Sequence, residues 1–174
     1  MLTPKENLLE SLKKDGHPLC LNNCYTMMRG FAPDPVFKLV RGNRVRGTNS
    51  VDVWGTQILF PADAPAAVPY VTEANQVVQD ICNWKDYVKV PDLLGRCQEG
   101  WEAAIESGKA IDHDKYLTMV VMGTGIFEQL HMLMTFEDTL TNMLEEPEAM
   151  EELIDAICEY RLNYMKLIVE HLHP

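Results

Sequence analysis

Residues 115–123, with the sequence KYLTMVVMG, constrain the fold of this chain more than any other segment. Between Leu117 and Met122, every residue except Thr118 is apolar. Such a short and nearly continuous apolar run is typical of a strand that is buried on both faces of a parallel sheet. The run passes through Gly123-Thr124-Gly125 into a helical pattern of apolar residues. The segment therefore predicts a β-strand followed by an α-helix, which is the repeating unit of α/β folds.

The rest of the chain alternates between helical and strand-like patterns. Thr3, Pro4 and Glu6 predict a capping box at the start of the first helix, which Gly16 would end. Further helices are predicted over residues 92–107, 127–134, 140–144 and 147–172, with a helical turn at 84–87. The last of these is expected to start with proline in its first turn and to carry a regular apolar stripe, formed by Met150, Leu153, Ile154, Ile157, Tyr164 and Ile168. Strands are predicted over residues 19–28, 50–60 and 75–81, and irregular chain over 29–50 and 61–70. Because strands alternate with helices, we expect an α/β domain.

The charge and composition of the chain exclude several classes of function. Its 174 residues include 15 Lys and Arg against 26 Asp and Glu, which gives a net charge of −11. Nucleic-acid-binding proteins normally present a basic face to phosphates, so no nucleic-acid partner is expected. No apolar run approaches the ~18 residues of a spanning helix. The N-terminal residues do not resemble a signal peptide, so we expect a cytoplasmic protein with no membrane partner.

The positive charge is concentrated near the N-terminus. Residues 1–50 contain eight basic and four acidic residues, whereas residues 51–174 carry a net charge of −15. Five cations fall within one stretch that is rich in Pro and Gly, and they are Arg29, Lys38, Arg41, Arg44 and Arg46. This stretch is either a binding site for a carboxylate or phosphate group or a solvated loop.

Gly123, Thr124 and Gly125 form the best candidate site. Glycines at the carboxyl end of a strand let backbone N–H groups approach a ligand, and the helix that follows presents free N–H donors to an anion. The third glycine of the dinucleotide fingerprint is missing, so a nucleotide-binding loop is not expected. The segment is either a ligand contact or a plain tight turn.

Asp52, Trp54 and Gly55 form a second candidate, at a bend predicted within residues 50–60. The carboxylate offers a hydrogen-bonding or acid/base group, the indole offers a stacking surface, and the glycine leaves room for a substrate. The alternative is that Trp54 is buried in the core and that Asp52 caps a turn.

Several segments, taken in their order along the chain, resemble the N-terminal half of the uroporphyrinogen decarboxylase superfamily. The closest resemblance is to its branch of corrinoid-linked methyltransferases. The segments are TPKENLLESLKKDG, VDVWGTQILFP, CNWKDYVKVPDL, YLTMVVMGTGIFEQLHMLM and LEEPEAMEELIDAICEYRLNYMKLIV. The last two are the most specific, because relatives likewise combine a glycine-containing strand exit with a later helix that starts with Asp or Glu, Pro and Glu.

The resemblance implies the N-terminal half of a (β/α)8 barrel with an extra N-terminal helix and with its active site at the carboxyl ends of the strands. Residues 1–174 would then be one partial barrel domain. Residues 1–50 would hold the first helix, the first strand and the basic segment, and residues 51–174 the βα units that end in a long helix. The residues implied to bind substrate are Arg29, Asp52, Trp54, Gly123, Thr124 and Gly125.

The resemblance also implies an activity, and it leaves three interpretations open. The expected function is part of a corrinoid-dependent methyltransferase that acts on a small molecule. The alternative is uroporphyrinogen decarboxylase of tetrapyrrole biosynthesis, whose Arg-Gln-Ala-Gly-Arg run corresponds here to Met28-Arg29-Gly30-Phe31, so that only Arg29 is retained. A third interpretation is a non-catalytic subunit, because the chain shows no complete acid/base or metal-ligand set. No catalytic residue is assigned.

The expected cofactors and partners follow from the same resemblance. Zinc and a corrinoid are implied for the complete enzyme, with neither bound by this half alone, and the isolated chain is expected to be inactive. A half-barrel leaves the edges of parallel strands unpaired. We therefore expect a partner that completes the barrel, either a second chain with the C-terminal half or a second copy of this chain. A corrinoid protein is a further expected partner, and a truncated chain is the remaining alternative.

Overall fold

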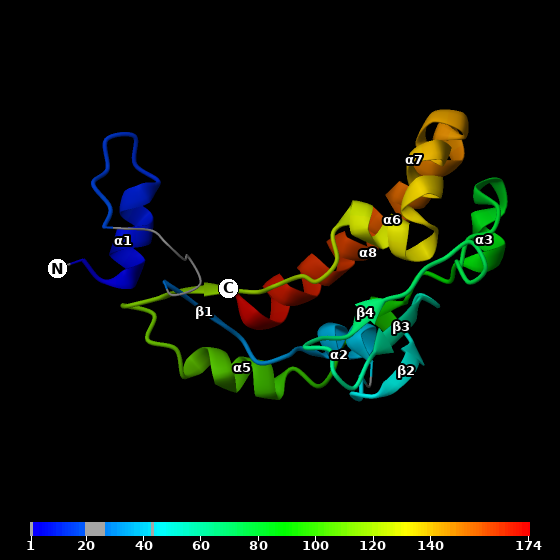
Figure 1. Cartoon of the computed structure of the whole chain (residues 1–174). Helices are drawn as coiled ribbons and strands as arrows, with labels where there is room; N and C mark the ends of the chain where they lie inside the picture. The colour runs from blue at the N-terminus through cyan, green and yellow to red at the C-terminus, as the bar shows by residue number, and fades with distance from the viewer. Residues whose placement is uncertain (1, 20–26, 43) are drawn as a thin grey trace. The chain divides into compact units, whose positions relative to one another are not determined.

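The computed structural model describes residues 2–19, 27–42 and 44–174. Most of the strand expected over residues 19–28, together with Cys20 and Cys24, lies outside the described residues. The fold is mixed α/β with small sheets. Its helices are α1 (Pro4–Ser11), α2 (Pro35–Arg41), η2 (Ile81–Asn83, 3-10), α3 (Trp84–Tyr87), α4 (Leu93–Arg96), α5 (Glu102–Lys109), α6 (Ile126–Leu133), α7 (Phe136–Glu145) and α8 (Pro147–Leu172). Its strands are β1 (Met28–Gly30), β2 (Thr48–Val51), β3 (Gln57–Phe60), β4 (Val68–Pro69) and β5 (Leu117–Met119) (Figure 1).

The chain divides into two compact units, each formed from segments that are distant in the sequence. The first unit consists of residues 1–35, 99–121 and 166–174, and the second of residues 36–98 and 122–165.

The first unit contains the N-terminal helix and a parallel strand pair. Thr3 and Glu6 form the predicted capping box of α1, in which the Glu6 N–H donates to the Thr3 hydroxyl at 3.2 Å and the Thr3 N–H to the Glu6 carboxylate at 2.8 Å. The helix ends at Ser11 and not near Gly16, and the Ser11 hydroxyl donates back to the Leu8 carbonyl at 2.6 Å. Serine hydroxyls that bond to the backbone in this way compete with the helix.

Strands β1 and β5 pair in parallel, with Arg29 opposite Thr118. The parallel pairing agrees with the βα pattern, but the predicted burial of the apolar run on both faces is wrong. All three residues of β5 are only partly buried, and Val121 just beyond it is 58% exposed. Within the described residues β5 has β1 as its one strand neighbour, so less protein covers it than in a larger sheet.

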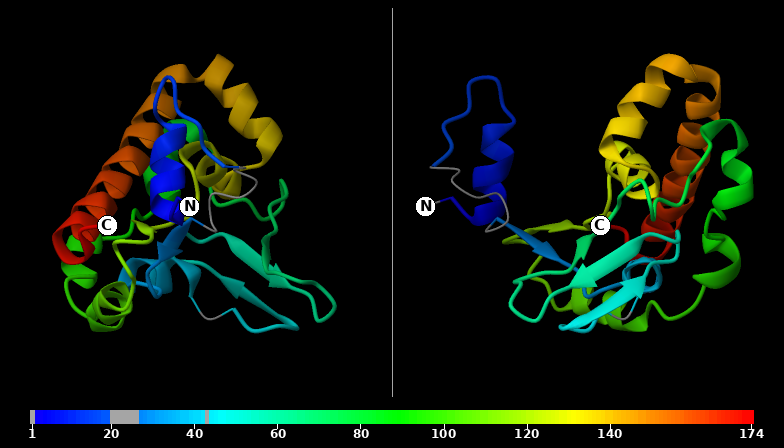
Figure 2. Two further views of the ribbon diagram at one scale, coloured as in Figure 1. Left: turned by 90° about the vertical axis from the view of Figure 1, so that its left-hand side faces the viewer. Right: turned by 45° about the vertical axis from the view of Figure 1, so that its right-hand side comes forward.

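The second unit contains an antiparallel meander in the order β2-β3-β4 (Figure 2). Thr48 lies opposite Phe60, and Val51 lies opposite Gln57, so residues 50–60 form a hairpin and not one strand. The chain reverses at Gly55, whose φ of +92° falls in a region that L side chains rarely adopt.

Helices α6 and α7, and α8 as far as Met165, belong to the second unit and agree with the helical patterns of the sequence. Helix α7 begins after Thr135, whose side chain accepts from the Asp138 N–H at 3.0 Å. Helix α8 begins at Pro147 as predicted, and its apolar stripe forms the centre of the core. Leu153 is fully buried, while Met150 and Ile157 are 1% exposed. Helices α6 and α7 contact each other directly.

Three segments differ from the sequence-based prediction. Helix α2 lies within the stretch 29–50, which was predicted to be irregular. The helix can form there because Pro35 occupies its first position, where proline is tolerated. The helix expected over 92–107 is divided into α4 and α5 around Gly100, which has a φ of +87°. No strand forms at the described residues 75–81, where the Val78 N–H donates instead to the Leu133 carbonyl at the end of α6, at 2.9 Å.

Candidate functional site

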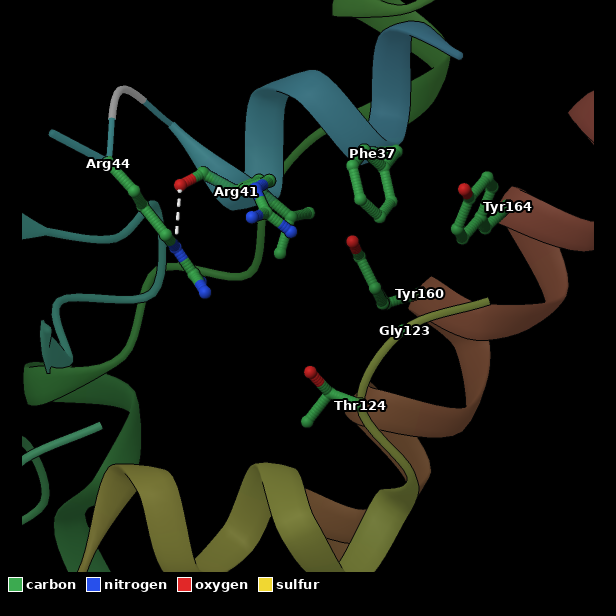
Figure 3. A pocket seen from close by; sticks show the side chains of 8 residues that line it. Phe37, Arg41, Arg44, Gly123, Thr124, Tyr160 and Tyr164 are labelled. Carbon is green, nitrogen blue, oxygen red and sulfur yellow. Dashed lines mark hydrogen bonds between the residues drawn. The ribbon is translucent and has the colours of Figure 1, made fainter. Parts of the chain in front are cut away.

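A cavity of about 170 Å³ lies within the second unit, and we call it the α2–α8 cavity. It is formed by the end of α2 and the residues after it, by the segment that precedes α6, and by one face of α8 (Figure 3). The residues that line it are Phe37, Val40, Arg41, Arg44, Gly123, Thr124, Tyr160 and Tyr164.

Two arginines form the polar wall of the α2–α8 cavity. The Arg44 Nε donates to the Arg41 carbonyl at 3.0 Å, which fixes the direction of the Arg44 side chain (Figure 3). Burial lowers the pKa of Arg44 below its ordinary value, the positive charge of Arg41 lowers it further, and the carboxylate of Asp52 partly opposes both effects. Two guanidinium groups held close together in a partly buried site favour a bound anion.

Aromatic rings form the rest of the wall, and the ring centre of one of them, Phe37, lies 5.6 Å from the Arg41 guanidinium. Phe37 on α2 faces Tyr160 and Tyr164 on α8 in the close view (Figure 3). Tyr160 and Tyr164 are 9% and 4% exposed. The ring of Trp54 lies edge-on against Tyr160, with 4.9 Å between ring centroids and an interplanar angle of 75°. Trp54 is itself 3% exposed and does not line the cavity, so it supports Tyr160 from behind.

The turn at residues 123–125 contributes backbone and one hydroxyl group. At Gly123 an added Cβ would meet no atom of the described residues within 4 Å, so this backbone faces open space. Thr124 has a φ of +59°, which is unusual for a β-branched residue. Its carbonyl accepts a hydrogen bond from Nη1 of Arg161 on α8. The structure therefore places two of the three predicted turn residues, Gly123 and Thr124, at the cavity.

Gly125 has a different role, as the N-cap of α6. A Cβ at this position would collide with the carboxylate of Glu128, which lies against the start of the helix. A carboxylate near the N-terminus of a helix is electrostatically favourable. The carboxylate of Glu128 thus occupies the N-terminus of α6, where the sequence suggested that a ligand anion binds. In the cavity the groups that can bind an anion are the guanidinium groups of Arg41 and Arg44.

Asp52 caps the hairpin turn between β2 and β3. Its Oδ1 accepts from the backbone N–H groups of Trp54 and Thr56, at 2.9 Å each. The sequence left open whether Asp52 and Trp54 contact a substrate or whether Asp52 caps a turn and Trp54 lies in the core. The structure shows the second arrangement. Burial raises the pKa of Asp52 above its ordinary value of 3.8, while the hydrogen bonds from Thr56 and Trp54 and the charge of Arg44 oppose this shift.

The five cations of the basic stretch have separate roles. Arg41 and Arg44 line the cavity, whereas Lys38 is an exposed residue of α2 that does not. Arg46 donates to the carbonyls of Ala62 and Ala64 and lies over the ring of Phe60. Arg29 belongs to the first unit, where its guanidinium lies 3.8 Å from the centre of the Tyr116 ring and donates to the Met28 carbonyl at 2.9 Å.

The sequence did not identify the aromatic wall. Tyr164 was part of the apolar stripe predicted for α8, but the pattern did not distinguish a core position from a cavity position. Phe37 lay in a segment that was predicted to be irregular. The described residues contain no group of three or more His, Cys, Asp or Glu side chains that could hold a metal ion. None of the helices formed by these residues has the length and apolar character needed to cross a membrane.

Comparisons with known proteins give no identification. The chain matches no protein-family model, and it has no significant match among curated proteins or among solved structures. Its function is therefore argued from its residues and from the geometry of the α2–α8 cavity.

Proposed function

We propose that this chain is the substrate-binding N-terminal part of an enzyme of the uroporphyrinogen decarboxylase superfamily, of the corrinoid-dependent methyltransferase type. The observation that carries the proposal is the α2–α8 cavity, in which Arg41 and Arg44 lie across from the Gly123-Thr124 turn. The order of segments along the chain supports the family, and the paired guanidinium groups support an anionic substrate.

The size of the cavity favours the methyltransferase over the decarboxylase. At about 170 Å³ it is close to the ~150 Å³ that holds one benzene ring. A substrate of this size is a small molecule, whereas a tetrapyrrole has four rings. Arg29, the one arginine retained from the decarboxylase run, is not among the residues that line this cavity.

The partly buried strand pair of the first unit supports the proposal that further chain completes a (β/α)8 barrel. Strands β1 and β5 form a two-stranded parallel pair, an arrangement that is normally covered and extended by more βα units. The proposed partner is a second chain that carries the C-terminal half of the barrel, or a second copy of this chain. The observation in favour is the half-buried apolar run of β5.

The roles proposed for this chain are binding and orientation. The resemblance implies that the zinc ligands of the complete enzyme would come from the C-terminal half. A corrinoid protein would exchange the methyl group with the substrate. Arg41 and Arg44 would hold the anionic end of the substrate, and the rings of Phe37, Tyr160 and Tyr164 would exclude water from its apolar part.

The proposal is tested by supplying the two rival substrates to the assembled protein. Light scattering and intact mass first establish whether the chain associates with itself or with a C-terminal half. The assembly is then given zinc with a methylated corrinoid, and separately uroporphyrinogen, and both are followed by absorption spectroscopy. With a thiol supplied as the methyl acceptor, the expected result is transfer of the methyl group from the corrinoid to the thiol sulfur, with release of the thiol proton. Turnover of uroporphyrinogen alone would establish the decarboxylase, and assembly without either reaction would establish a non-catalytic subunit.

A further inference from the structure

The two walls of the α2–α8 cavity differ in chemistry, and this difference narrows the class of ligand. The guanidinium groups of Arg41 and Arg44 lie on one side, with that of Arg41 at 5.6 Å from the centre of the Phe37 ring, and the rings of Tyr160 and Tyr164 lie on the other (Figure 3). A ligand that matches both walls carries its charge at one end and an apolar body at the other.

The charges around the cavity favour an anion. Arg41 and Arg44 contribute two positive charges, and among the described residues the carboxylate whose charge acts on Arg44 is that of Asp52. The Asp52 carboxylate already accepts two backbone hydrogen bonds in its own turn, so it satisfies the arginines only in part. Arg161 adds a further positive charge beside Thr124, to whose carbonyl it donates. The positive excess remains after every one of these groups is counted.

The shape of the polar wall favours a carboxylate over a phosphate. A phosphate group carries oxygen atoms on all sides, and each of them needs a donor when it is removed from water. The arginines supply the charged donors from one side, the hydroxyl groups of Thr124, Tyr160 and Tyr164 supply single neutral donors, and Phe37 and Val40 supply none. A carboxylate presents its two oxygens in one direction, and the guanidinium fork of arginine matches that geometry.

The apolar part of the ligand is of the size of one ring. A cavity of about 170 Å³ holds a six-membered ring, given that an apolar cavity of ~150 Å³ accepts benzene. Three aromatic side chains around this space favour a flat ring, because offset and edge-to-face contacts between rings add to simple burial. Trp54 holds Tyr160 in place from behind, with its ring edge-on at 4.9 Å, so this wall is formed before a ligand arrives.

We infer that the α2–α8 cavity binds a monocarboxylic acid with a single aromatic ring, whose carboxylate contacts Arg44 and Arg41 and whose ring lies against Phe37, Tyr160 and Tyr164. The inference rests on the proposed function in that it takes this cavity as the substrate site. It adds the chemical class of the substrate.

The test measures binding of three probes to the 174-residue chain by isothermal titration calorimetry. Benzoate carries the ring and the charge, benzamide is its neutral analogue, and inorganic phosphate carries charge without a ring. We expect benzoate to bind with a Kd of about 1 mM, a value reasonable for nine non-hydrogen atoms. Benzamide should bind at least tenfold more weakly, and phosphate should not compete with benzoate.

Matched variants assign the binding to this cavity. Arg44→Ala should weaken benzoate about tenfold or more, since charge-assisted hydrogen bonds are lost. Arg44→Lys, which keeps the charge without the fork, should recover part of the affinity. Lys38→Ala removes one cation from the exposed side of α2 and should leave the affinity unchanged. Unchanged thermal melting of each variant shows that it has folded.

Each contrary result has a separate meaning. Phosphate binding that exceeds benzoate binding and depends on Arg44 would overturn the carboxylate inference while leaving an anion site, and with it the proposed function, in place. Equal binding of benzoate and benzamide would overturn the role of the arginines. A chain that binds neither benzoate nor phosphate would overturn both this inference and the anionic substrate of the proposed function.

Discussion

Replacing Thr124 by glycine should give a more stable protein than replacing it by alanine, which reverses the usual order of these two residues. Thr124 has a φ of +59°, in the left-handed region. Alanine retains the steric conflict of this conformation, which costs about 1–2 kcal/mol per residue. Glycine avoids the conflict but loses about 0.5–1 kcal/mol through the greater freedom of its unfolded chain. The net difference is therefore about 0.5–1 kcal/mol in favour of glycine.

The comparison of two variants isolates the backbone, because both remove the Thr124 hydroxyl and methyl groups. Thr141 supplies a matched control, as an exposed threonine inside the regular helix α7. In such a helix glycine is less stable than alanine by about 1 kcal/mol. Urea denaturation followed by circular dichroism gives the free energy of unfolding for all four variants. If the glycine variant at position 124 is the less stable, as at position 141, the left-handed backbone at Thr124 is refuted.

Two further predictions concern the core and the turn of the second unit. Leu153→Ala should lower the free energy of unfolding by about 3 kcal/mol, because Leu153 is fully buried. Leu144→Ala is the control and should change this free energy by less than about 0.5 kcal/mol, because Leu144 is 84% exposed. A loss below about 1 kcal/mol for Leu153→Ala in urea denaturation would contradict the packing of α8. Burial raises the pKa of Asp52 in the folded protein above 3.8, so the folded state binds the carboxyl proton of Asp52 more tightly than the unfolded state does. The free energy of unfolding should therefore fall as the pH rises from about 3.8 through the raised pKa. Asp52→Asn keeps the Oδ1 acceptor and should remove this fall in a pH series of unfolding measurements, and a variant with the wild-type pH profile would show that Asp52 is not the titrating group.

Elements with strong local signals were predicted well from the sequence. The capping box of α1 and the start of α8 at Pro147 depend on contacts within a few residues. The apolar stripe of α8 was also predicted, because a helix that covers a core repeats its buried positions at a fixed interval.

Elements that depend on distant contacts were not predicted. The prolines around α2 signalled irregular chain, although Pro35 is compatible with the first turn of a helix. Residues 75–81 contain the apolar pair Val77-Val78, which resembles a strand, but the hydrogen-bond partner of Val78 is the Leu133 carbonyl at the end of α6. That partner is more than fifty residues away along the chain, so the local pattern gave no indication of it.

The residues of the candidate site were also predicted only one segment at a time, because their grouping depends on distant contacts. The sequence singled out Gly123 and Thr124 for their position after a strand and Arg41 and Arg44 for their charge, but it gave no reason to join them. The fold of the second unit brings both pairs to one cavity and adds Tyr160 and Tyr164 from α8. A helical stripe does not reveal which of its buried aromatic rings faces a cavity, because core and cavity positions share the same spacing.

Trp54 affects the α2–α8 cavity without lining it, because it packs against the lining residue Tyr160. Its indole is 3% exposed and lies edge-on to Tyr160, and its Nε1 has no hydrogen-bond partner among the described residues. A buried N–H without a partner carries a cost in free energy, so the apolar packing of the ring must outweigh it. The packing holds Tyr160 against the α2–α8 cavity, and Asp52 anchors the turn that carries Trp54 through the Trp54 N–H at 2.9 Å. The Asp52-Trp54 bend therefore acts on the site through Tyr160, as the element that positions one of its walls.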